Sequence, residues 1–232
     1  MAERLWRCLR VARWRLKRVI NLKKQTIMKI YNLIILDESG SMDHIKQAAI
    51  DSVNETLQSI RGAQKENEGQ EHFVSFVSFN SNVKTIFDCV SADSVNDLTG
   101  RDYEPSGLTA LYDAMGMSLT ALRQRVQSDD KVLVTIVTDG MENASREYSG
   151  VAIKAMVDEL KARGWIFAYM GANHDVEAAA AHISITNVMH FEASVDGADA
   201  MSKKQKSARE GLYKRMSSRF FSAEKENEDF FK

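Results

Sequence analysis

The stretch YNLIILDESGSM (31–42) joins a compact apolar run to a segment rich in side-chain oxygens. The run YNLIIL is typical of a buried strand, because a strand covered on both faces reads as a continuous apolar sequence. Two acids and two serines follow within five residues, in DESGS. This segment has two interpretations: it is ordinary turn and helix-cap chemistry, or it supplies part of a metal site.

Outward from this stretch, strand-like runs alternate with longer segments of helical periodicity. The pattern predicts strands over 31–36, 72–79, 83–90, 131–138, 165–172 and 187–192. It predicts helices over 42–60, 108–126, 147–164 and 175–183, with a polar loop over 61–71. The alternation predicts a doubly wound α/β fold, with a mostly parallel sheet and helices on both faces. The turn NSN (80–82) suggests a hairpin, so we expect one antiparallel edge strand.

The length of 232 residues and the hydrophobic content of 44% suit one substantial core. We expect this domain to occupy residues 29–193. A basic extension precedes it at 1–28. A charged extension follows it at 194–232, in which we predict one peripheral helix and a frayed acidic end.

Charge is divided unevenly, although the net charge is only −1. Residues 1–29 carry ten Lys or Arg and one acid, whereas the rest carries 21 basic and 31 acidic residues. An acidic body argues against a nucleic-acid partner, which needs clustered positive charge. Only Cys8 and Cys89 occur, too few for a disulfide framework or a cysteine-based zinc site.

The N-terminal segment has two open interpretations. Its helical spacing and arginines suit a basic amphipathic helix on an anionic surface. Alternatively, Met28 opens MKIYNLIIL as a natural start, and residues 1–27 are upstream sequence. No apolar run approaches the roughly 20 residues that span a bilayer, and no secretory signal is evident. We therefore expect a cytoplasmic protein without a transmembrane segment.

Three loops carry oxygen-bearing side chains to the expected carboxyl edge of the sheet, where ligands of open α/β sheets bind. They are DESGS (37–41), PSGLTALYDA (105–114) and TDGMENAS (138–145). Hydroxyls and carboxylates, with no cysteine or histidine among them, suit a hard divalent cation. The expected cation is Mg²⁺, or the similar Mn²⁺.

These residues resemble the metal-ion-dependent adhesion site of von Willebrand factor type A domains. The pattern is Asp37-x-Ser39-x-Ser41, followed by Thr109 and Asp139 in the family's order. The resemblance extends from about residue 29 to about residue 192. The stretches 138–145 and 164–175 further resemble bacterial intracellular members of the family.

The resemblance implies a role for each position. Ser39 and Ser41 would coordinate the metal directly, Thr109 directly or through water, and Asp37 and Asp139 mainly through bound water. An open coordination position would then take an Asp or Glu carboxylate of a partner protein. We therefore expect a non-enzymatic binding module. Relatives of this bacterial kind often operate beside AAA+ ATPases or in multi-protein assemblies, so the expected partner is a protein. The oligomeric state stays open.

Local structure offers another explanation for each loop taken singly. Ser39, Ser41, Asp43 and Thr109 are good helix-capping residue types, and TDG is a common turn. Asp175 is expected to cap the following helix, while the roles of the residues at 142 and 143 stay open. The predicted partner-binding rim is Glu38, Met42, Gly107, Leu108, Gly140 and Asn173.

Two further hypotheses remain at this stage. The first is a Mg²⁺-dependent phosphotransferase or phosphatase of the haloacid dehalogenase type, which also places an aspartate behind its first strand. It would need a second acid where Ser39 stands, and the three loops contain no Lys. The second is that the acidic end AEKENEDFFK (223–232) occupies the metal site of its own or a neighbouring molecule.

Overall fold

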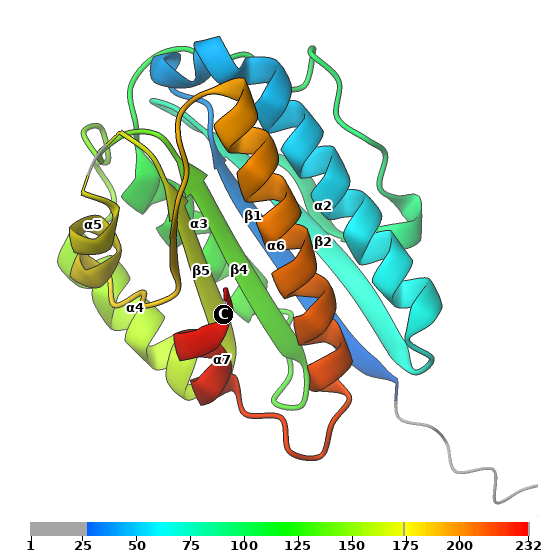
Figure 1. Cartoon of the computed structure of the whole chain (residues 1–232). Helices are drawn as coiled ribbons and strands as arrows, with labels where there is room; N and C mark the ends of the chain where they lie inside the picture. The colour runs from blue at the N-terminus through cyan, green and yellow to red at the C-terminus, as the bar shows by residue number, and fades with distance from the viewer. Residues whose placement is uncertain (1–26, 174, 232) are drawn as a thin grey trace, which may run out of the picture.

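The sheet has six strands in the order β3-β2-β1-β4-β5-β6 (Figure 1). The computed structural model describes residues 27–173 and 175–231, so the predictions for residues 1–26 lie outside it. The strands are β1 (Met28–Asp37), β2 (Gln70–Phe79), β3 (Val83–Ser91), β4 (Lys131–Thr138), β5 (Trp165–Gly171) and β6 (Val188–His190). Only the β2–β3 pair is antiparallel. The predicted mostly parallel sheet with one antiparallel edge strand is confirmed.

Helices cover both faces, with α2 and α6 side by side on one face and α3 and α4 on the other (Figure 1). The helices are η1 (Gly40–Ile45, 3-10), α2 (Lys46–Glu66), η2 (Ala92–Ser94, 3-10), α3 (Leu111–Arg123), α4 (Gly150–Ala162), α5 (Val176–His182), α6 (Val195–Met216) and α7 (Ala223–Asp229).

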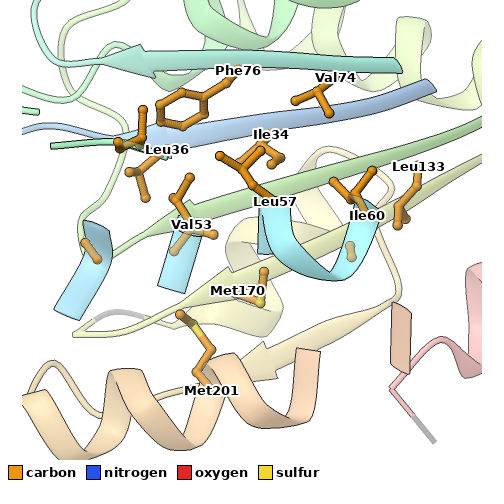
Figure 2. Close-up of a cluster of buried hydrophobic side chains, with 14 of the residues drawn as sticks. Ile34, Leu36, Val53, Leu57, Ile60, Val74, Phe76, Leu133, Met170 and Met201 are labelled. Carbon is orange, nitrogen blue, oxygen red and sulfur yellow. The ribbon is translucent and has the colours of Figure 1, made fainter. Parts of the chain in front are cut away.

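The core has two halves, one on each face of the sheet, and strand β1 contributes to both. Its side chains alternate between faces, so Leu33 and Ile35 pack with α3, α4 and α5, while Ile34 and Leu36 pack with α2 and α6. Both faces are covered, which explains the continuous apolar run of β1. Figure 2 shows the half of the core that contains Ile34 and Leu36. Helices α2 and α6 and strand β2 contribute Val53, Leu57, Val74, Phe76 and Met201 to it.

Two predicted boundaries were wrong near the first helix. The chain after β1 first forms the 3-10 turn η1, and α2 then continues to Glu66 through most of the predicted loop 61–71. The polar residues there are good helix formers, and Ala63 is buried against the core, so the helix extends. Helices α3 and α4 are shorter at both ends than predicted.

The C-terminal helix is not peripheral, contrary to the prediction. Helix α6 packs along α2 and onto the sheet. The buried positions of α6 recur at helical spacing, but several of them are polar or charged. The sequence therefore does not show them as an apolar face. The buried positions are Ala198, Met201, Ser202, Gln205, Arg209, Leu212, Tyr213 and Met216.

A polar network joins α6 to the sheet. The buried Arg209 guanidinium donates to Thr135 Oγ1 at 2.8 Å and to the Tyr213 hydroxyl at 3.2 Å. That hydroxyl donates in turn to Asn32 Oδ1 of β1. The His72 ring lies edge-on to Tyr213 at 4.6 Å, and its burial, together with the Arg209 charge, lowers the pKa of His72 to about 4.

The last segment is also ordered onto the sheet, so the predicted frayed end was wrong. Helix α7 lies at the start of β5, where β6 is too short to pair. The Asn227 amide replaces a strand there: its Oδ1 accepts from Phe167 N at 3.0 Å and its Nδ2 donates to Trp165 O at 2.8 Å. The Glu226 carboxylate pairs with Arg215. This end of β5 lies away from the carboxyl edge (Figure 1), which contradicts occupation of the chain's own metal site by the tail.

Candidate metal centre

Three segments bring the predicted ligands to one edge of the sheet. Strands β1 and β4 are parallel neighbours in which Leu36 pairs with Val137. Asp37, the last residue of β1, and Asp139, which follows β4, therefore lie at the same edge. The two serines lie at the start of η1, and Thr109 lies in the loop before α3.

Hydrogen bonds link three of these five side chains to one another. Ser41 Oγ donates to Asp139 Oδ1 at 2.6 Å, and Ser39 Oγ lies 3.1 Å from Ser41 Oγ. A methyl carbon placed on Gly140 would lie 3.4 Å from Thr109 Oγ1, 3.8 Å from Ser41 Oγ and 3.9 Å from Asp37 Oδ2. Oxygens from all three segments therefore converge beside Gly140.

The capping explanation of these residues is not supported. Ser39 stands at the N-cap of η1 but makes no side-chain cap bond, and the N-cap of α3 is Ala110 rather than Thr109. The hydroxyl of Ser41 is directed to Asp139 instead of to the helix. By contrast, Asp175 does cap α5, accepting from Ala178 N at 3.0 Å as predicted.

The Asp37 carboxylate is held rigidly in a buried position. Thr138 Oγ1 donates to its Oδ2 at 2.6 Å, and Ser39 N donates to its Oδ1 at 2.7 Å. Burial raises the pKa of Asp37 to about 6; these hydrogen bonds oppose the shift, and the nearby Asp139 charge adds to it. A buried carboxylate beside a second one favours a positive charge at this place.

The donor set fits a hard cation. Asp139 is 2% exposed and its Oδ2 has no hydrogen-bond partner among the described residues, so that oxygen lacks compensation for its burial. No ion pair with Asp37 or Asp139 occurs within residues 27–173 and 175–231. In the same part of the chain no three His, Cys, Asp or Glu residues gather into a metal-binding group. Neutral hydroxyls would therefore complete the shell around the two carboxylates, which suits Mg²⁺ or Mn²⁺.

Two residues with open roles hold Thr109 in place. Asn143 Oδ1 accepts from Thr109 N at 2.9 Å, and Asn143 N donates to Thr109 O at 3.0 Å. The Glu142 carboxylate accepts from Tyr112 N at 2.9 Å, in the first turn of α3, and from the hydroxyl and backbone N–H of Ser145. The loop after Asp139 is thereby tied to the loop that carries Thr109. Sequence offered only the closeness of both residues to TDG as a signal.

Sequence reasoning also missed two residues around Asp37. The buried Tyr103 hydroxyl donates to the Asp37 carbonyl at 2.6 Å, and Thr138 donates to the carboxylate as described. Thr138 precedes Asp139 directly and could have been suspected for that reason. Tyr103 lies in a loop far along the chain, and no local pattern marks it.

Two predicted rim residues were wrong. Met42 is 1% exposed and belongs to the core, because η1 turns its side chain under α2. Glu38 is 6% exposed and its carboxylate accepts from Glu104 N, so it fixes the loop before Thr109. The other rim positions keep some exposure: Gly107, Leu108 and Asn173 are exposed, and Gly140 is half-buried.

The family model of the von Willebrand factor type A domain matches residues 33–206, which include all five predicted ligand positions. The chain belongs to this family. The domain covers most of the sheet and extends into α6, in accord with the packing of that helix. No curated protein sequence matches significantly.

Solved structures share the von Willebrand factor type A fold at low sequence identity. A von Willebrand factor type A protein from Catenulispora acidiphila is 12% identical, with a TM-score of 0.57 over 79% of this chain and 43% of that one. The pilus adhesin SpaC from Lactobacillus rhamnosus GG is 14% identical, with a TM-score of 0.62 over 82% of this chain and 31% of that one. The minor pilin PilB from Streptococcus sanguinis, as a D319A mutant, is 13% identical, with a TM-score of 0.55 over 82% and 64%.

These similarities establish the Rossmann-like fold of the domain. The chain spans less than two thirds of the length of these solved chains, so their activities as whole proteins do not transfer. The haloacid dehalogenase alternative is not supported, because the family match is to a different kind of domain. None of the helices within residues 27–173 and 175–231 combines the length and the apolar composition of a membrane-spanning segment.

Proposed function

We propose that the domain is a non-enzymatic binding module that uses a metal-ion-dependent adhesion site to hold a carboxylate of a partner protein. The observation that carries this proposal is the convergence of three hydroxyls and two carboxylates at one sheet edge, none of them used as a helix cap. Family membership supports it, since these domains commonly mediate metal-dependent protein interactions.

In this proposal each residue has a separate task. Ser39, Ser41 and Thr109 supply neutral hydroxyl ligands, while Asp37 and Asp139 orient water and balance the charge. A bound Mg²⁺ or Mn²⁺ would offer an open coordination position to an anionic oxygen, because neutral ligands leave the ion electron-poor. Asn143 and Glu142 keep the Thr109 loop in register with Asp139.

The same residues support the non-enzymatic role in this proposal. A phosphotransferase of the alternative type needs a nucleophilic carboxylate and a second acid nearby. Asp37 is buried and held by Thr138 and Ser39, and the position two residues later is a serine. No turnover of p-nitrophenyl phosphate with Mg²⁺ is expected, and turnover abolished by Asp37→Asn would contradict this part of the proposal.

The test of carboxylate capture compares two short peptides that differ in one atom group. A blocked peptide with a central glutamate should bind in Mg²⁺ and not in EDTA, and the glutamine peptide should bind at least tenfold more weakly. Calorimetry or backbone amide shifts in the loops after β1 and β4 would report the binding. Equal affinity of the two peptides in Mg²⁺ would reject the carboxylate mechanism.

The setting of the protein remains a proposal from the resemblance. A cytoplasmic location and a partner within an AAA+ ATPase or another assembly fit the bacterial intracellular type. A metal-dependent pull-down from source cells, with and without chelator, would identify the partner.

A further inference from the structure

Two exposed apolar side chains are sequence neighbours of residues at the candidate metal centre. Leu108, beside Thr109, is 55% exposed, and Met141, beside Gly140, is 69% exposed. Large hydrophobic side chains are costly to leave in water when they gather around one place, and such patches mark interaction sites. A partner that reaches the metal ligands must therefore lie against apolar surface.

A groove continues this apolar surface away from the metal centre. It has a volume of ≈ 480 Å³ and runs between the start of α3, the loop after β4 and helix α5. Leu111 and Tyr169 line it deeply, and Met141, Ala178 and Ala179 line it nearer the surface. Met141 directly follows Gly140, the residue beside which the candidate ligand oxygens converge. One end of the groove therefore adjoins the candidate metal centre.

The charged groups in the groove are engaged elsewhere. The Glu142 carboxylate accepts hydrogen bonds from backbone N–H groups of three residues and from one hydroxyl. Asp175 caps α5, and the His182 ring stacks on Tyr112 with centroids 6.4 Å apart. The Glu142 carboxylate is therefore poorly placed to pair with a charged side chain of a partner, and the apolar residues that line most of the groove favour an apolar occupant.

We propose that this groove receives one bulky apolar side chain, such as leucine, methionine or phenylalanine, from the partner segment whose carboxylate faces the metal. The inference rests on the proposed function and specifies its partner chemistry. An extended segment advances roughly 3.3 Å per residue. Because the groove and the converging oxygens meet at the neighbouring residues Met141 and Gly140, the proposal places the apolar residue one or two positions from the Asp or Glu. The recognised element is then an acidic residue beside an apolar one.

The experiment measures the affinity of blocked hexapeptides in Mg²⁺ for the full chain. Each peptide carries one glutamate, with either leucine or serine at the next two positions, and a glutamine version serves as the carboxylate control. Binding of Mn²⁺ alone is measured first, so that failure of the metal centre is recognised separately. The leucine peptides should bind about tenfold more tightly than the serine peptides, as partial burial of one large apolar side chain gives.

Two groove variants and one matched control decide whether the preference arises here. Met141→Gln removes the exposed apolar wall, and Ala178→Gln places a polar side chain over the groove on an exposed helix position. Met117→Gln makes the same change at a methionine of α3 that is 44% exposed and outside the groove. Both groove variants should lose the leucine preference while Mn²⁺ affinity stays unchanged, and the control should keep both.

Three results would overturn the inference and leave the proposed function intact. They are equal binding of leucine and serine peptides, retention of the leucine preference in both groove variants, and preference for a lysine or arginine neighbour in a further peptide pair. Absence of Mn²⁺ binding, or Mn²⁺ binding without any carboxylate peptide bound at millimolar concentration, would instead reject the proposed function on which the inference rests.

Discussion

Replacing Gly140 with alanine adds one methyl group at the point where the candidate ligands converge. The methyl carbon would lie 3.4 Å from Thr109 Oγ1, 3.8 Å from Ser41 Oγ and 3.9 Å from Asp37 Oδ2. These are ordinary van der Waals separations, and Gly140 is not among the glycines with positive φ. The apo protein should therefore gain about 0.4–1 kcal/mol through its less flexible unfolded chain.

The same methyl group should weaken cation binding. Mg²⁺ holds its oxygens at roughly 2.0–2.1 Å in a strict octahedron and keeps several waters, so it needs the space beside these oxygens. Displacing one ligand or water should lower the affinity at least tenfold, or about 1.4 kcal/mol. Gly62→Ala is the control, because nothing lies within 4 Å of a methyl group there.

Urea unfolding in EDTA and in Mg²⁺ measures both effects on the same variants. Wild type and Gly62→Ala should be stabilised by Mg²⁺, whereas Gly140→Ala should show a smaller increment despite a folded apo state. An unchanged Mg²⁺ increment in Gly140→Ala would refute the location of the cation beside this glycine.

Three other substitutions test a residue that positions Thr109 and two buried residues that stabilise the fold. Asn143→Ala leaves the N–H of Thr109 without its acceptor and should weaken Mn²⁺ binding about 10- to 100-fold in a titration, whereas Asn143→Asp keeps the acceptor and should bind nearly as well. The pKa of His72 is about 4 in the fold and about 6.5 when unfolded, so the unfolded chain binds the extra proton between these values, and stability falls as pH drops through that window. The expected loss of stability between pH 7 and pH 4 is about 3 kcal/mol. The raised pKa of Asp37 changes stability in the opposite direction over this range. The contribution of His72 is therefore measured as the difference in urea stability between wild type and His72→Gln at each pH. Asn227→Ala removes the amide that covers the edge of β5 and should cost about 2–4 kcal/mol in urea unfolding, with faster aggregation on heating; an unchanged midpoint would show that the edge is covered otherwise.

The sheet could be predicted from the sequence because its strands are buried on both faces. The continuous apolar runs at β1, β4 and β5 identify central strands without knowledge of their neighbours. Helix α6 could not be placed in this way. Its buried stripe includes Arg209 and Gln205, which read as surface residues until partners such as Thr135 are known.

The candidate ligands could be predicted because parallel strands end at a common edge. Their surroundings could not, since Tyr103 reaches the site from a loop that no local pattern marks, and the position of Asn143 in the loop after β4 did not reveal that it holds Thr109. The side chains of Glu38 and Met42 were misplaced for a related reason. Whether a residue beside a ligand faces solvent or the core depends on the 3-10 turn after β1, and the helical pattern of the sequence did not reveal that turn.

Every role proposed for these residues depends on the binding of a divalent cation at this edge of the sheet. A Mn²⁺ titration followed by electron paramagnetic resonance measures this binding on wild type, Ser41→Ala and the control Ser128→Ala. Ser128 is an exposed serine before β4, at the opposite end of that strand from Asp139. We expect one site per chain, displaced by Mg²⁺, with affinity about tenfold lower in Ser41→Ala and unchanged in Ser128→Ala. Equal affinity in all three proteins, or no bound Mn²⁺ in wild type, would contradict this expectation.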